Sequence, residues 1–102
     1  MKTGFLRCDI SQGQFTDEYA VDGKAYNNEG FSLFAAKSDL RCDRFPDREG
    51  DVVQGGITVD ILDEQEGLML VRLPKRTLEN GDVFTVRAEQ VENVQLRSHQ
   101  KA

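Results

Sequence analysis

The chain has 102 residues, of which 38% are hydrophobic and 30% are charged. This length predicts a single folded domain, and the high charge content is typical of a small globular protein with much of its chain at the surface. The formal net charge of −5 disfavours nonspecific attraction to nucleic-acid phosphates or anionic lipids, although a local basic patch could act against it.

The N-terminal stretch MKTGFLRCDI has an apolar run that Arg7 and Asp9 interrupt, so it does not resemble a signal peptide. No stretch reaches the roughly 20 apolar residues that span a bilayer, and we expect a cytoplasmic protein with no membrane partner. Cys8 and Cys42 lack CxxC spacing, which gives no support for a zinc site or a redox pair. In the cytoplasm they are expected to be reduced, partly buried thiols rather than a disulfide.

Alternating hydrophobicity predicts strands through the first part of the chain. The opening run 4–10 and the segment 14–21 are the first two, and the second places Phe15, Tyr19 and Val21 on one side with Asp17 interrupting. Asp17 would then be a carboxylate on an apolar face, unless a bulge or a partner such as Arg87 resolves the conflict. The next strand is predicted at 30–36, after a long polar loop at 21–30.

The segment 37–48, KSDLRCDRFPDR, does not fit a strand. Its basic and acidic residues recur at three and four positions, which favours at most one short helical turn near 38–45 before Pro46 ends it. The alternative is a solvated loop whose charges pair with one another.

The clearest pattern in the chain is a hairpin over 56–74. Residues 57–62 alternate in hydrophobicity, residues 68–73 are apolar on both faces at their start, and the acidic turn 63–67 ends in Gly67. We expect the acids to keep the turn hydrated. A cation site is the alternative, although the EF-hand spacing is missing.

Further strands are predicted at 84–88 and 91–96, and the opening and closing runs are plausible edge strands that could meet in a barrel. We therefore expect an all-β fold, a small antiparallel barrel or half-open sandwich of five to seven strands, with one domain at 1–97 and a flexible tail at 98–102. It resembles SH3-like and OB-like barrels in size and strand rhythm, a resemblance that carries no function.

The sequence gives little support for catalysis or cofactor binding. His99 is the single histidine and lies in the predicted tail, and no phosphate-binding or dinucleotide-binding glycine motif is present. We therefore expect no catalytic, metal-binding or cofactor-binding residues. A small carboxylate-based enzyme stays as an unfavoured alternative, because the many acids mark no particular pair.

The preferred hypothesis is a noncatalytic module that binds a protein partner, or a second copy of itself, through an edge strand or the loops 21–30 and 37–48. The alternative is nucleic-acid binding, if 37–48 packs near 73–81 so that arginines converge beside stacking aromatics; otherwise the arginines neutralise neighbouring acids. The candidate surface comprises Lys37, Arg41, Arg44, Arg48, Arg72, Lys75, Arg76, Tyr26 and Phe45.

Overall fold

The structure is a computed structural model that describes residues 1–79 and 81–96. Its strands are β1 (Lys2–Gln12), β2 (Glu18–Lys24), β3 (Gly30–Ala36), β4 (Leu40–Arg41), β5 (Val53–Gln65), β6 (Leu68–Arg72), β7 (Val83–Arg87) and β8 (Val91–Leu96). Two short 3₁₀ turns, η1 (Lys37–Asp39) and η2 (Ala88–Gln90), precede β4 and β8.

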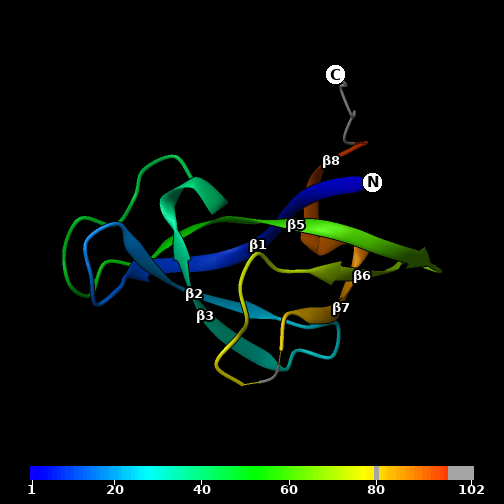
Figure 1. Cartoon of the computed structure of the whole chain (residues 1–102), viewed down its shortest axis with the longest axis horizontal. Helices are drawn as coiled ribbons and strands as arrows, with labels where there is room; N and C mark the ends of the chain where they lie inside the picture. The colour runs from blue at the N-terminus through cyan, green and yellow to red at the C-terminus, as the bar shows by residue number, and fades with distance from the viewer. Residues whose placement is uncertain (80, 97–102) are drawn as a thin grey trace.

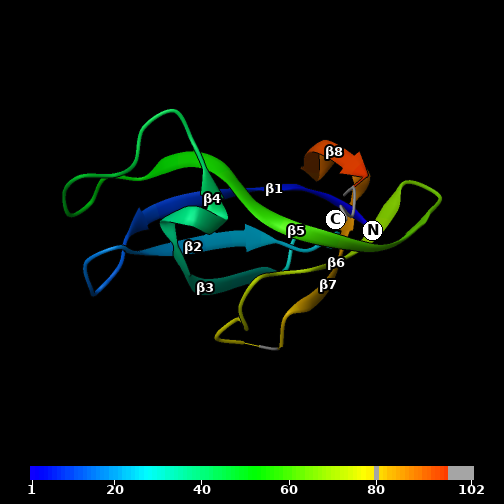
Figure 2. The same cartoon turned by 45° about the horizontal axis from the view of Figure 1, so that its top comes forward.

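The strands form one antiparallel sheet that curls into a half-barrel, as Figures 1 and 2 show. The continuous path in this sheet runs β3-β2-β1-β5-β6-β7, while β4 pairs with β5 and β8 pairs with β1. The predicted all-β antiparallel architecture is confirmed. The six-stranded path lies within the expected five to seven strands, and β4 and β8 add pairings beside it.

The core lies inside the curl because each strand turns alternate side chains inward. Leu6 and Ile10 of β1 are fully buried and face the inward residues of the neighbouring strands. Phe31 of β3 stacks on Phe84 of β7 with ring centroids 4.8 Å apart, which joins the two ends of the path through side chains. The remaining core residues include Val21, Leu33, Ile57, Val59, Val71, Leu73 and Val86.

Loops bind the outer edges of the two terminal strands of the path. The backbone N–H of Tyr26, in the β2–β3 loop, donates to the carbonyl oxygen of Thr85 in β7 at 2.9 Å. On β3, Ser32 accepts a backbone hydrogen bond from Leu78 at 2.7 Å, and its own N–H donates to the Glu79 carboxylate at 2.8 Å. These bonds cover edge backbone groups that would otherwise be open for pairing.

The strand predicted at 14–21 is wrong in its first half. Strand β2 begins at Glu18, and Phe15, expected in the core, lies in the preceding turn and is 71% exposed. Asp17 is also an exposed turn residue with φ of 66°, so its carboxylate does not lie on an apolar face. A short turn requires such left-handed backbone, and Asp tolerates it better than most residues.

Two further expectations about position need correction. The opening run does meet the closing run, but β1 is no edge strand, because it pairs with β5 on one side and with β2 and β8 on the other. The β5–β6 hairpin has the expected turn, with Glu66 and Gly67 at positive φ. Its strand β6 has one buried face rather than two, since Met69 is buried while Leu70 is 36% exposed.

The predicted helical turn is the 3₁₀ turn η1, which is shorter than expected and begins one residue earlier. The turn ends at Asp39 and β4 begins at Leu40, because Leu40 pairs with Ile57 and is buried in the core. A second short helical turn, η2, is also present, whereas at most one was expected. It depends on a side-chain contact of Gln90 that residue spacing does not reveal.

Candidate binding site

Strand β1 has different partners along one of its sides. That side pairs with β8 from Lys2 to Leu6 and with β2 from Asp9 to Gln12. Arg7 and Cys8 lie between these two ladders, where β8 and β2 separate, and their registered partners are on β5 alone. The sheet therefore forks at this point.

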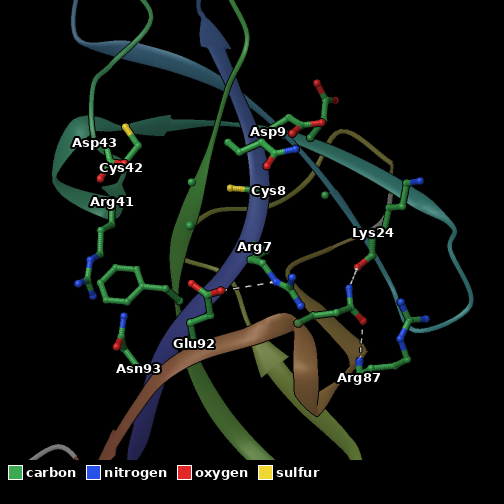
Figure 3. A pocket seen from close by; sticks show the side chains of 17 residues that line it. Arg7, Cys8, Asp9, Lys24, Arg41, Cys42, Asp43, Arg87, Glu92 and Asn93 are labelled. Carbon is green, nitrogen blue, oxygen red and sulfur yellow. Dashed lines mark hydrogen bonds and ion pairs between the residues drawn. The ribbon is translucent and has the colours of Figure 1, made fainter.

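A hollow of about 690 Å³ lies at this fork and is called the fork hollow below. A volume of this size falls within the usual range for ligand sites. Its lining residues come from β1, β2, β4 and the loop after it, β5, β7, η2 and β8: Phe5, Arg7, Cys8, Asp9, Asp22, Gly23, Lys24, Arg41, Cys42, Asp43, Gln54, Gly55, Gly56, Arg87, Gln90, Glu92 and Asn93. Figure 3 shows Arg41 and Asp43 on one side of the hollow and Lys24 on the opposite side.

Gly55 lets the chain after β4 pass close to the wall of the fork hollow. A Cβ at Gly55 would overlap the carbonyl oxygen of Arg41 and lie 2.9 Å from the Cβ of Cys42. Real side chains do not approach backbone this closely, so any other residue would push Arg41 and Cys42 outward. The absence of a side chain at Gly55 thus fixes the position of this wall.

The opposite wall is held by Gln90 of η2, whose side chain is buried. Its amide nitrogen donates to the carbonyl oxygen of Lys24 at 2.9 Å, and its amide oxygen accepts from the backbone N–H of Arg87 at 2.6 Å. The guanidinium of Arg87 donates to the carbonyl oxygen of Tyr26 at 2.7 Å. These bonds hold the end of β2 against η2 and so maintain the fork.

Charged side chains of both signs line the fork hollow. Asp9 and Asp22 are directly opposite in the β1–β2 ladder, and one Asp22 oxygen accepts the Ser32 hydroxyl at 2.6 Å. The guanidinium of Arg7 donates to the carbonyl oxygen of Glu89, and its Nε lies 3.8 Å from the Glu92 carboxylate.

Five of the lining charges have no salt bridge within residues 1–79 and 81–96: Asp9, Asp22, Asp43, Lys24 and Arg41. The guanidinium of Arg41 instead lies over the ring of Phe5, 5.3 Å from its centroid. Three acids and two bases on one concave surface are thus without an ion-pair partner in the described chain and available to a charged ligand.

The two free thiols also line the fork hollow. Burial, and secondarily the Asp9 carboxylate, raises the pKa of Cys8 to about 12. The pKa of Cys42 is also raised, by burial and then by Asp43. Both thiols are therefore protonated at neutral pH, whereas the thiolate is the form that attacks electrophiles and binds metals.

No group of three His, Cys, Asp or Glu side chains suited to a metal ion occurs in the part of the chain that the structure describes. His99 and the predicted tail 98–102, together with the domain boundary at 97, lie outside the described residues.

One of the nine predicted surface residues, Arg41, lines the fork hollow. Lys37 lies 4.9 Å above the ring of Phe45, which packs 5.0 Å from Tyr19. Arg44 forms an ion pair with Asp51 at 2.7 Å, as the charge-pairing alternative for this segment expects. Arg48 is exposed in the loop between β4 and β5, and Tyr26 lies against β7.

The structure does not bring the predicted arginines together. Arg72 ends β6, and Lys75 and Arg76 lie in the following loop, which hydrogen-bonds to β3 through Leu78. Figures 1 and 2 both show this yellow loop on the other side of the sheet from the green segment that follows β4. The condition for one cationic patch, packing of 37–48 near 73–81, is not met.

Sequence reasoning missed Asp9, Gly55 and Gln90 as site residues. Asp22 and Lys24 fall within the candidate loop 21–30 but were not singled out, and both belong to strand β2. The alternation of buried and exposed residues in 4–10 could have placed Arg7 and Asp9 on one face. The cross-strand register that adds the β2 residues is not readable from either segment alone.

Comparisons with protein-family models, with curated proteins and with solved structures found no match. Among the described residues, no helix is long and apolar enough to cross a membrane.

Proposed function

We propose that the protein is a noncatalytic binding module that engages a protein partner through the fork hollow. The observation that carries this proposal is the convergence of three acidic and two basic side chains, none of them in a described salt bridge, on one concave surface. A polypeptide surface commonly presents both signs of charge, so it can complement such a site.

The chemistry of the lining favours binding over catalysis. Cys8 and Cys42, the strongest potential nucleophiles in the hollow, have raised pKa values and stay protonated at neutral pH. The nucleic-acid alternative requires the predicted arginines to converge on one surface. They are instead dispersed, and acids are interleaved with the bases that line the hollow. The two free cysteines suit the cytoplasm, where we place this binding.

Photo-crosslinking tests the proposal. A photoreactive amino acid replaces Gln54, an exposed residue of the fork hollow, and a matched protein carries it at Glu66 on the β5–β6 turn. After irradiation in an extract of the source cells, we expect a discrete protein adduct from position 54 that is absent from position 66. The adduct should disappear when Lys24→Glu and Arg41→Glu are added to the position-54 protein.

Identical adducts from both positions, an adduct to nucleic acid, or no adduct at either position would overturn the proposal. An adduct of twice the chain mass would identify the protein partner as a second copy.

A further inference from the structure

The charges of β1 and β2 form an ordered array on the face that lines the fork hollow. In β1, Arg7 and Asp9 are exposed while Leu6, Cys8 and Ile10 between and beside them are buried. Alternate residues of a strand point to the same face and are about 6.6 Å apart, so Arg7 and Asp9 form one row.

The second row comes from β2. Asp22 and Lys24 are exposed there, with Gly23 buried between them. Because Asp9 is registered with Asp22, the antiparallel course of β2 carries Lys24 to the side of Arg7, where the ladder opens at the fork. The face thus presents two carboxylates next to each other and two cations one strand repeat further on.

Asp9 and Lys24 have no salt bridge in the described part of the chain, and like charges directly opposite each other in a ladder are unfavourable. A ligand cation beside the two carboxylates would offset their mutual repulsion, and a ligand anion beside Lys24 would give that ammonium group an ion-pair partner. An extended peptide has this spacing, because its residues n and n+2 lie on one face about 6.6 Å apart. A free amino acid does not, since its ammonium and carboxylate groups flank a single carbon.

We propose that the fork hollow binds an extended polypeptide segment that carries a basic and an acidic side chain two residues apart. This inference rests on the proposed function and names the partner chemistry of the same site. The geometry accepts either order of the two charges, since a bound segment can run in either direction along β1. Cys8 is buried between Arg7 and Asp9, its thiol has no described hydrogen bond, and it forms part of the wall beneath the segment.

Synthetic peptides test this inference against the full chain. Each is a capped, threonine-rich heptapeptide with two charged positions. In one pair lysine and glutamate are two residues apart, in either order; in a second pair both positions are lysine or both glutamate. A fifth peptide has lysine and glutamate adjacent, hence on opposite faces when extended. Amide chemical shifts of the isotope-labelled protein measure binding at low salt.

We expect at least one peptide with mixed charges two residues apart to bind roughly threefold to tenfold more tightly than the like-charge and adjacent peptides, as two exposed ion pairs would provide. The Lys24→Glu variant should lose this preference and favour the peptide with two lysines. Lys75→Glu makes the same charge change outside the hollow and should leave the preference unaltered.

Equal binding of all five peptides, or an unchanged preference in Lys24→Glu, would overturn the inference. If the position-54 adduct is present while the peptides show no preference, the inference fails and the proposed function stands. If the adduct is also absent, both fail.

Discussion

Asp9 lies directly opposite Asp22 across the β1–β2 ladder, and both carboxylates face the fork hollow. Opposed like charges lower stability by roughly 0.2–1 kcal/mol relative to a neutral pair. Elsewhere in the sheet, Asp60 of β5 is registered with Arg72 of β6, so the chain also contains the favourable counterpart of this arrangement.

The Asp9→Asn substitution should therefore raise the free energy of unfolding by about 0.2–1 kcal/mol. The matched Asp60→Asn substitution should lower it, because it removes an attraction to Arg72. Urea denaturation at low salt measures both. Destabilisation by Asp9→Asn would show that Asp9 already has a favourable partner and that the hollow does not offer an unpaired carboxylate to a cation.

Gly55→Ala should destabilise the fold by about 1–3 kcal/mol, because the added methyl group would overlap the Arg41 carbonyl oxygen and crowd Cys42. The control is Gly30→Ala, where the nearest atom to the added methyl group is 3.9 Å away. Thermal unfolding compares the two variants. Equal melting temperatures would contradict the close approach of the segment after β4 to β5.

Gln90→Ala should lower the free energy of unfolding by about 1–3 kcal/mol, since the backbone N–H of Arg87 and the carbonyl oxygen of Lys24 would lose their partner. Gln54→Ala changes the same residue type at an exposed position of the hollow and should be close to neutral. Urea denaturation tests the pair. A neutral Gln90→Ala would mean that η2 does not hold the fork.

The two thiols should react with a disulfide reagent at different rates in the native protein. Cys42 is half-buried and should react first at pH 8, whereas Cys8 is buried, with its pKa raised to about 12. The Cys42→Ser variant isolates Cys8, which should react rapidly after urea unfolding and slowly before it. Rapid native labelling of Cys8 would contradict its burial beneath the array.

The raised pKa of Cys8 also predicts a loss of stability at high pH. Its ordinary value of 9.0 applies to the unfolded chain and about 12 to the folded one, so the folded state resists losing the proton. Stability is unaffected below pH 9 and falls as the pH rises from 9 towards 12, by about 1.4 kcal/mol per pH unit. The free energy of unfolding of the Cys8→Ala variant should not show this fall over the same pH range, because the variant lacks the thiol. Parallel curves for the two proteins would refute the assignment.

The fold was more predictable than the site because strand burial leaves a local pattern in the sequence. Alternating apolar residues predict β3 at its observed bounds and the β5–β6 hairpin with its Gly67 turn, and the closing run predicted at 91–96 has the bounds of β8. The pattern failed at Phe15, where a turn residue continues the apparent period of β2. It also failed at Leu70, whose face of β6 is exposed.

The site depends on relations between distant segments, which local patterns do not contain. Arg41 was selected for its charge and does line the fork hollow, but Arg72 and Arg76 do not. The Asp9–Asp22 pairing follows from register, and the fork exists because Gln90 holds Lys24 from 66 residues away. Gly55 lies within β5, where its missing side chain leaves room for Cys42, a segment contact that the local pattern around Gly55 does not contain.

The most direct measurement for the central claim is amide chemical-shift mapping of the partner captured at position 54, titrated into the isotope-labelled protein. The largest shifts are expected at Arg7, Asp9, Lys24 and Gln54, with the turn at Glu66 unchanged. Shifts concentrated at the β5–β6 turn or in the loop around Lys75, with none at the fork, would contradict the account.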